Sequence, residues 1–309
     1  MYIDSNRNIE LTSSNFFLFE IDNHTNLGIN NGAERHVTDY TVMLSIDTFI
    51  PLICYTVLWY SVNLAVTTHC WTTWQEGIRR KRLVNVTTSL IHSSVSGVFL
   101  FVYFIRNTQI MFSSPMHYYS YSDSQIVMLS IGYFIYDACD LLVNDRISIA
   151  TCVLLFHHIA SVYVLSTAIA SKKFLLYAYW ALLMEVSSIF LHSRSLLHIS
   201  KLSATSMIAV SKAIGYMNII AFIIFRFGVQ FFLIGWAYVN MDNMHIYYVW
   251  IAMGGGGIFL VINIGLFLRI LHSDGLLCSS VVSHERLDAL LEDNEYKSGK
   301  LEKKELLIN

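Results

Sequence analysis

The chain has 309 residues, of which 55% are hydrophobic and only 14% are charged. Soluble domains carry about a quarter charged residues, so this composition excludes an ordinary soluble domain and predicts a membrane protein. A net charge of -2, with no basic stretch interleaved with aromatic residues, argues against a nucleic-acid partner. The five cysteines form no CxxC pair, so neither a disulfide framework nor a zinc site is expected.

The first segment, residues 1–42, is a polar leader rich in Asn, Ser and Thr. It lacks the basic start and short apolar core of a cleaved signal peptide. Within it, Asn23-His24-Thr25 is a sequon for N-glycosylation, which has meaning only where this end is lumenal or extracellular.

Seven apolar runs follow, each near the ~20 residues that a membrane-spanning helix needs. They cover residues 43–66, 84–105, 125–144, 147–169, 174–192, 213–238 and 246–270. The sequence thus predicts an all-α, multi-pass transmembrane bundle with seven spans, or six if one run is re-entrant. The third and fourth runs are separated only by Asn144-Asp145-Arg146, which predicts an antiparallel hairpin.

Basic residues beside the spans predict the orientation of the bundle. Arg79, Arg80, Lys81 and Arg82 follow the first run, and most other juxtamembrane basic residues belong to the same side. The positive-inside rule then places the N-terminus outside or in the lumen, and the polar tail in the cytoplasm. In that tail, residues 285–291 have the leucine spacing of a short amphipathic helix.

Ionisable residues inside the apolar runs give the main functional signal. Asp137 and Asp140 lie in the third run and His157 and His158 in the fourth. A charged group in the bilayer costs roughly 2.5–3.5 kcal/mol, so it has to face a protein-lined cavity, pair, or change protonation state. Adjacent histidines diverge by about 100° around a helix and cannot point the same way, whereas His158 and Ser161 are expected to share a side.

Further polar residues extend this pattern to neighbouring runs. His92 belongs to a stripe with Asn85, Ser89 and Ser96 in the second run, and Glu185 and Ser188 share a face in the fifth. We expect four consecutive helices to turn His, Asp and Glu towards one cavity. Arg226, in the sixth run, is expected to pair with a carboxylate or a headgroup phosphate.

Structural roles remain open for the same residues. A lone intramembrane histidine such as His92 is often an interhelical hydrogen-bonding group. The structural alternative for Asp137 and Asp140 is capping or pairing near the membrane face. For the paired histidines the functional reading is favoured, because packing gives little reason for two adjacent imidazoles. The run Gly254–Gly257 follows no strand, which favours close helix packing or a hinge over a phosphate-binding loop.

Four segments resemble the TLC-domain family, which includes the ceramide synthases and the translocon-associated TRAM proteins. They are Asn85–Ser93, Gly132–Asp140, Leu155–His158 and Leu183–Leu191. The resemblance covers residues 80–272, so residues 43–79 form a first helix with its basic loop and residues 273–309 a polar tail. The Asp-x-x-Asp and Glu-Val-Ser-Ser-Ile-Phe segments are similar to TLC domain-containing proteins one and two.

This resemblance implies two alternative functions. Kinship with proteins one and two implies a plasma-membrane protein that regulates phospholipid composition and fluidity by limiting the incorporation of polyunsaturated chains. Kinship with the ceramide synthases implies an acyl-CoA-dependent acyltransferase, in which His157 and His158 correspond to the catalytic histidines and Asp137 or Asp140 orients one of them. The following helix has Glu185-Val-Ser-Ser188 in place of the second ceramide-synthase signature, so ceramide synthesis itself is not expected.

On either alternative the partners are membrane lipids or acyl chains, with acyl-CoA as donor in the enzymatic case. His92, Ser161, Glu185, Ser188 and Arg226 are then candidate lipid-binding residues. We expect no cofactor and no metal, because the potential ligands are sparse. The endoplasmic reticulum is the alternative location, and the lipid and the oligomeric state are left open.

Overall fold

The computed structural model describes residues 38–74, 77–113, 115–144, 148–201 and 207–273. Seven helices in it are long and apolar enough to cross a membrane, which confirms the predicted all-α fold with seven spans. The glycosylation sequon, the amphipathic tail segment 285–291 and most of the short turn after Asn144 lie outside the described residues.

The spans are the following helices. They are α1 (Ile46–His69), α2 (Ile78–Arg106), α4 (Tyr121–Asn144), α5 (Ile149–Ser171), α6 (Leu175–Leu182) with α7 (Glu185–Ile199), α8 (Ile208–Ala221) with η3 (Phe222–Gly228) and α9 (Val229–Val239), and α10 (Ile246–Trp250) with η5 (Ile251–Gly255) and α11 (Gly256–Ser273). The remaining elements are η1 (Tyr40–Leu44), α3 (Thr108–Ser113) and η4 (Met241–Asn243).

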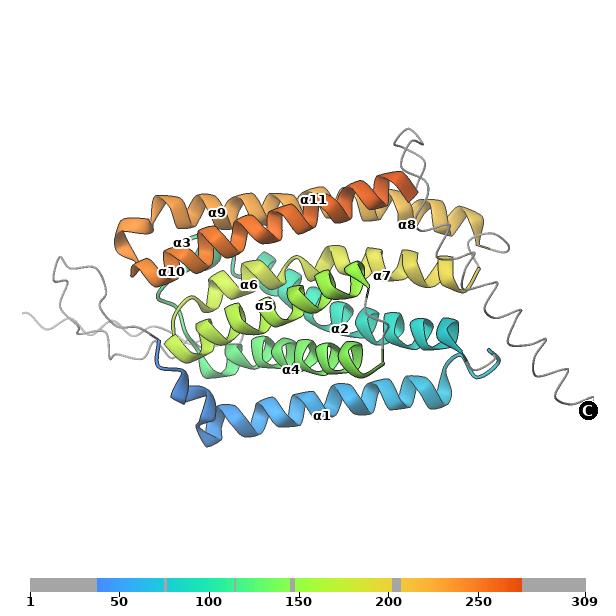
Figure 1. Ribbon diagram of the computed structural model, residues 1–309. Coiled ribbons are helices and arrows are strands. Elements are labelled where there is room, and N and C mark those ends of the chain that lie inside the picture. The colour runs from blue at the N-terminus through green and yellow to red at the C-terminus, as the bar shows by residue number, and fades with distance from the viewer. Residues whose placement is uncertain (1–37, 75–76, 114, 145–147, 202–206, 274–309) are drawn as a thin grey trace, which may run out of the picture.

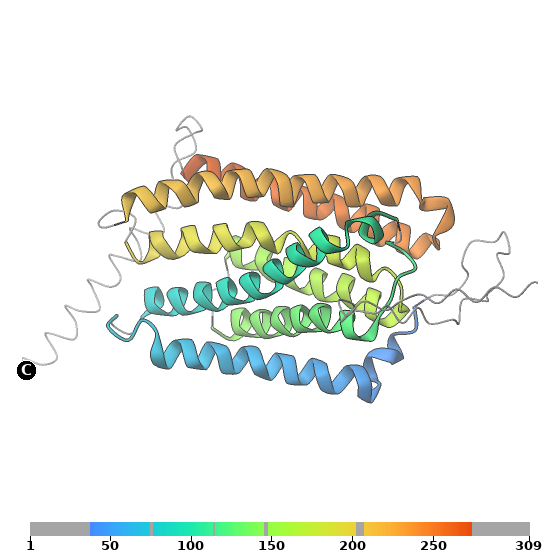
Figure 2. The ribbon, with the colours of Figure 1, turned by 180° about the vertical axis from the view of Figure 1, so that it is seen from behind.

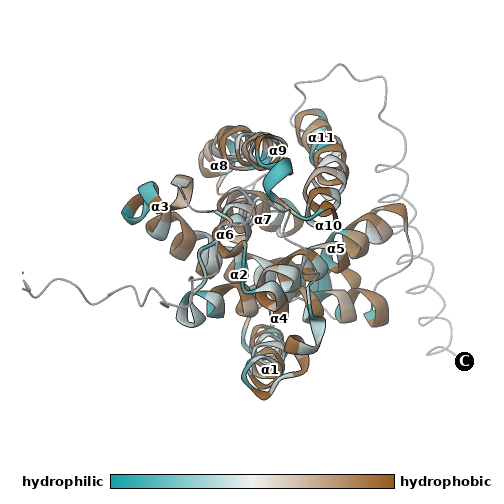
Figure 3. Cartoon of the chain, turned by 90° about the vertical axis from the view of Figure 1, so that its left-hand side faces the viewer, coloured by the Kyte–Doolittle hydropathy of each residue, from teal (hydrophilic) through white to brown (hydrophobic). Residues whose placement is uncertain are grey.

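The spans run side by side and form a bundle with more than one layer of helices (Figure 1). Helix α1 lies along one edge and packs on α4, while the pair formed by α8–α9 and α11 lies along the opposite edge. Between them, α4 packs on α5 and α2 packs on α7; Figure 2 shows α2 crossing the back of the bundle. Figure 3, which looks along the bundle, places α2 and α4 near its centre.

Burial follows this arrangement. In the most apolar part of each span, 56% of the residues are buried in α4 but only 6% in the last span. The exposed residues there are mostly Ile, Leu, Val and Phe, which are suited to contact with lipid chains. The helical form of each span follows from the same setting, because the bilayer offers no water to satisfy the backbone and a helix satisfies it internally.

Two glycines allow the central helices to approach closely. A Cβ on Gly132 of α4 would lie 2.8 Å from Tyr55 Cβ of α1, and one on Gly97 of α2 would lie 3.0 Å from the backbone nitrogen of Val186 in α7. Small residues at such crossings let membrane helices pack by van der Waals contact. The α1–α4 and α2–α7 interfaces therefore depend on glycine.

Three of the spans are irregular. The fifth is interrupted by a turn at Leu183 and Met184, between α6 and α7. The sixth and seventh contain π-helical segments, η3 and η5. Short π-helical segments in α-helices are frequent at functional sites, and these three irregularities all lie beside the cavity described below. In the run Gly254–Gly257, for which close helix packing was expected, Gly256 does pack closely, because a Cβ there would lie 3.0 Å from Ile234.

At the end of the bundle where α5 finishes, η1 is tied to the spans by hydroxyl groups. The Thr38 hydroxyl lies 2.8 Å from Tyr248, and the Tyr40 hydroxyl lies 2.8 Å from Thr167 and also contacts Tyr247. These contacts join η1 to α5 and α10. Thr167 and Tyr248 also line the cavity, so η1 and the residues just before it lie near one of its ends.

Candidate lipid-binding site

A cavity lies between five of the spans. Its walls come from Phe134 of α4, from α5, from α6 and the start of α7, from η3 and α9, and from α10, η5 and α11. Its volume is ≈ 140 Å³, measured as the space open to the centre of a water-sized sphere. Most of the wall is aliphatic or aromatic, with Leu165, Leu233 and Trp236 as examples. The cavity is therefore suited to an apolar ligand.

Ionisable and amide side chains line the end of the cavity that is farther from η1. They are His157, Glu185, Arg226, Gln230 and Asn263, with the hydroxyl of Ser161 beside them. On α5 the wall extends over eleven residue steps, from His157 to Ala168. At 1.5 Å per residue this is roughly 16 Å, about half of the ~30 Å hydrocarbon core of a bilayer. The cavity thus has the length of one leaflet and a polar end.

Arg226 is the centre of this polar end. Its Nε donates to Ser187 Oγ at 2.7 Å, Nη2 to Ser188 Oγ at 2.8 Å, and Nη1 to Asn263 Oδ1 at 3.1 Å. The guanidinium also lies over the ring of Phe222, 5.2 Å from its centroid. All these partners are neutral, and Arg226 forms no ion pair with a carboxylate of the described residues.

The other polar residues at this end are only partly satisfied. Glu185 Oε2 accepts a 2.6 Å hydrogen bond from Ser93 of α2. Gln230 Nε2 donates to Gly256 O at 3.0 Å, whereas its Oε1 and His157 Nδ1 have no partner among the described residues. Buried polar atoms in proteins nearly always have a partner. Gln230 Oε1 and His157 Nδ1 are therefore buried polar atoms at this end that the described residues leave unsatisfied.

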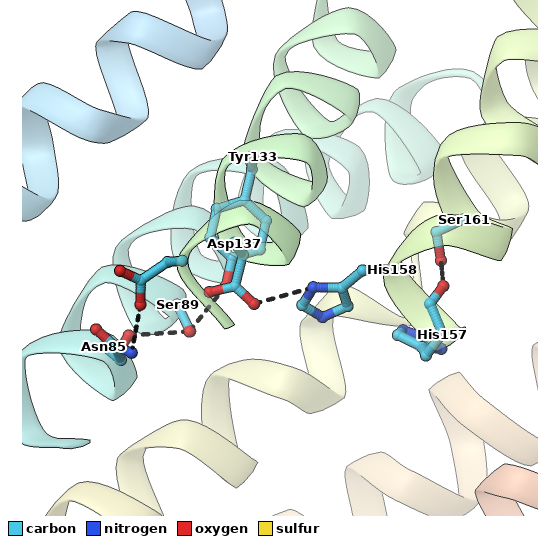
Figure 4. A network of polar contacts seen from close by, with 8 residues as sticks. Asn85, Ser89, Tyr133, Asp137, His157, His158 and Ser161 are labelled. Atoms are coloured by element: carbon cyan, nitrogen blue, oxygen red, sulfur yellow. Dashed lines mark hydrogen bonds and ion pairs between the residues drawn. The ribbon is translucent and has the colours of Figure 1, made fainter. Parts of the chain in front are cut away.

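A second polar cluster lies outside the cavity, between α2, α4 and α5 (Figure 4). His158 Nδ1 lies 2.9 Å from Asp137 Oδ2, although the ring is not aligned for a straight hydrogen bond. Tyr133 donates from its hydroxyl to Ser89 Oγ at 2.8 Å. Its ring stacks on His92, with centroids 3.9 Å apart. In this cluster the histidines are packing and pairing groups, enclosed by aromatic residues.

Asp140 is part of a third arrangement, at the far end of α4. It accepts hydrogen bonds of 2.8 Å from the side-chain amides of Asn85 and Asn144. These bonds join α2 to the last turn of α4. Its neighbours thus give Asp140 an interhelical, structural role.

The residues that the structure describes contain no group of three His, Cys, Asp or Glu placed to hold a metal ion. The four cysteines among them are free and exposed. The polar end of the cavity combines one guanidinium, one imidazole, one carboxylate, amides and hydroxyls, which is a set for hydrogen bonding to a polar head group.

A family model for the TLC domain matches residues 82–272, which is more than half of the chain. The chain belongs to the TLC domain family. The matched residues include α4, α5 and every element that lines the cavity. The family resemblance expected from the four sequence segments is confirmed.

Individual relatives carry the same domain. TLC domain-containing protein 2 of Danio rerio is 31% identical over 195 residues, which are 63% of this chain and 77% of the relative. TLC domain-containing protein 1 of Gallus gallus is 29% identical over 198 residues, 62% of this chain and 73% of the relative. The human protein 1 is 28% identical over 202 residues, covering 64% and 77%.

Within this TLC domain the expected convergence on one cavity holds for His157 and Glu185 but not for the aspartates or the other histidines. His157, Ser161, Glu185 and Arg226 line the cavity. His92, Asp137, Asp140 and His158 belong to the packed clusters beside it, and Ser188 reaches the cavity only through its bond to Arg226. The reason is that α4 is buried between α1, α2 and α5, so its acidic face meets helices and not the cavity.

The expected sharing of a side by His158 and Ser161 is also corrected. Ser161 donates to the backbone carbonyl of His157 at 2.8 Å and lines the cavity beside it, while His158 turns to α4 (Figure 4). Two residues that complete the polar end, Ser187 and Asn263, were not among the candidates. The sequence could have pointed to Asn263 as a site residue, because it is the one amide in a largely apolar predicted span.

Proposed function

We propose that this TLC-domain protein binds acyl chains or lipids in its intramembrane cavity and thereby regulates the phospholipid composition and fluidity of its membrane. By resemblance, the effect is to limit the incorporation of polyunsaturated, fluidising chains, and the plasma membrane is the proposed location. The observation that supports this proposal is a cavity between the spans, with apolar walls over roughly 16 Å of α5 and a polar end.

Binding is favoured over catalysis by the placement of the two histidines. General-base chemistry needs an imidazole that both reaches the reacting group and is oriented by a partner. Here the histidine beside a carboxylate, His158, lies outside the cavity, and the histidine in the cavity, His157, has no carboxylate partner among the described residues. The acyl-CoA-dependent acyltransferase remains the second candidate, because the His157 ring does line the cavity.

Filling the cavity tests the proposal. Ala181 lines the wall at α6, so Ala181→Phe places a large side chain where the acyl chain is proposed to lie. We expect cells that express this variant in place of the native chain to show the phospholipid profile of cells lacking the protein. The measurement is a lipidome resolved by unsaturation and by sphingolipid class.

The matched control is Ala65→Phe, because Ala65 is exposed on α1, away from the cavity. This variant is expected to keep the native profile at equal expression. A profile that Ala181→Phe leaves unchanged would refute the role of the cavity. A change confined to ceramides would refute the phospholipid role.

A further inference from the structure

The most unusual group in the cavity is the guanidinium of Arg226. An arginine has five N–H donors, and the three hydrogen bonds to Ser187, Ser188 and Asn263 leave one donor each on Nη1 and Nη2. Arg226 lines the cavity, and no described residue accepts from these two donors. A cation that faces a cavity in a membrane span without a counter-ion is a site for an anion.

We propose that Arg226 binds the terminal oxyanion of a single-chain amphiphile, a long-chain carboxylate or monoacyl phosphate, whose chain fills the apolar part of the cavity. This inference rests on the proposed function and specifies the ligand's chemistry. The two open N–H groups, one on each terminal nitrogen, form the fork that a carboxylate or phosphate accepts in bidentate fashion.

The nearest acidic residue of the cavity does not compete for this site. Glu185 accepts from Ser93 and makes no ion pair with Arg226. Ser187 and Ser188, at the start of α7, instead hold the guanidinium in place with neutral hydroxyls. The positive charge is therefore fixed in position by neutral hydroxyls, and Glu185 acts on it through the electrostatic field of the cavity and not through a direct ion pair.

A second donor for the same anion comes from α5. His157 Nδ1 is buried, has no partner among the described residues, and belongs to a ring that lines the polar end. Nδ1 is covered by protein atoms in this conformation, so the ring donates from it to an oxyanion once it has turned towards the cavity. The unpartnered imidazole is thus explained by the same ligand.

The shape of the cavity favours a ligand with one chain. About 140 Å³ spread over roughly 16 Å leaves a cross-section of about 9 Å² for sphere centres. A bore of this size admits one acyl chain. A free fatty acid or a lysolipid therefore fits with its whole chain inside, whereas a diacyl phospholipid would leave its second chain outside the cavity.

Comparing ligands that share one chain tests the inference without any mutation. The full-length protein in phosphatidylcholine nanodiscs is titrated with radiolabelled palmitate, hexadecanol, hexadecylamine and palmitoyl lysophosphatidate, and binding to protein-free nanodiscs is subtracted. We expect palmitate or lysophosphatidate to bind about tenfold or more tightly than hexadecanol, as hydrogen bonds to a charged group predict. Hexadecylamine should bind more weakly than hexadecanol.

Substitution of Arg226 tests whether this residue causes the preference for the acid over the alcohol. Arg226→Gln keeps hydrogen-bonding capacity but removes the charge, so it should abolish the preference for the acid and leave hexadecanol binding within about twofold. The matched control is Arg106→Gln, because Arg106 is an exposed cation at the end of α2, outside the cavity wall. This control should keep the native preference.

The outcomes separate this inference from the proposed function. Equal binding of acid and alcohol, blocked by Ala181→Phe, would overturn the anion site but leave acyl-chain binding intact. No saturable binding of any chain would overturn both. A preference for palmitate over lysophosphatidate identifies a free carboxylate as the ligand, and the reverse identifies a lipid phosphate. If Arg226→Gln does not fold, the ligand series on the native protein decides.

Discussion

Two adjacent histidines in α5 have different surroundings and, we infer, different roles. His158 contacts Asp137 inside the packed bundle, whereas His157 faces the cavity next to Phe259, with ring centroids 5.1 Å apart. Adjacent residues of a helix are separated by about 100°, so one pair of side chains reaches two compartments. At the scale of single residues, one histidine of the pair thus belongs to the polar cluster around Asp137 and the other to the cavity wall.

Substitution of these histidines distinguishes binding from catalysis. Gln retains a hydrogen-bonding group at position 157 but is no acyl-group nucleophile or general base. For a lipid binder we expect His157→Gln to keep the native lipidome effect within about twofold, measured in cells that lack the native chain. An enzyme that depends on this imidazole should lose roughly 100-fold or more of its rate.

His158→Gln serves as the comparison for this experiment. It disturbs the contact with Asp137 and should lower the unfolding temperature of the purified protein, because a buried carboxylate then lacks its partner. His157→Gln should leave that temperature nearly unchanged. Loss of the lipid effect with His157→Gln at full stability would contradict the binding function.

Interfaces between whole helices depend on two small residues. Gly132 sits where α4 meets α1, and its neighbours are the Tyr55 side chain and the backbone of Thr56 at 3.0 Å. Since that backbone cannot move without shifting the helix, the approach of α1 and α4 is set by the absence of a Cβ. The next residue of α4, Tyr133, belongs to the polar cluster and stacks on His92 of α2.

Gly132→Ala is therefore expected to destabilise the bundle. A Cβ 2.8 Å from Tyr55 Cβ forces the helices apart, and overpacking of this kind costs about 1–3 kcal/mol. Thermal unfolding in detergent measures the effect. Gly235→Ala is the control: a Cβ there meets no heavy atom within 4 Å, so it should be neutral or stabilise by about 0.4–1 kcal/mol. Equal behaviour of both variants would contradict the close crossing.

On the scale of the whole molecule, the chain enters the bundle at one end and, after seven spans, leaves it at the opposite end. Tyr40 in η1 precedes the first span at one end, and the last span finishes at Ser273 at the other (Figure 1). An odd number of crossings requires this, whichever compartment lies on either side. The orientation itself is still a prediction from the basic residues after the first span.

Topology mapping tests that prediction. In intact cells a glycan on Asn23 should be sensitive to glycosidase and be lost in Asn23→Gln, whereas an epitope appended after Asn309 should be accessible to antibody only after permeabilisation. The physical reason is that Arg79 to Arg82 favour the cytoplasmic face. Accessibility of both ends from the same side of the membrane would contradict seven spans. An unglycosylated Asn23 together with an epitope that antibody reaches in intact cells would show that the orientation is the reverse of the one predicted.

The sequence by itself determined the seven spans and the family. Apolar runs of the right length must become helices in a bilayer, since each backbone group has to be satisfied within its own segment. That rule is local, so hydropathy was sufficient. The four segments that carry the TLC resemblance are also local, and the family match covers them.

Only the tertiary structure decided which polar residues meet. Periodicity showed that His157 and His158 diverge, but not which of them faces the cavity, because that depends on where α4 and α11 pack. Arg226 and Asn263 are 37 residues apart and come together through the crossing of two spans. Membrane helices associate by shape and small-residue contacts between distant segments, and no local pattern encodes those contacts.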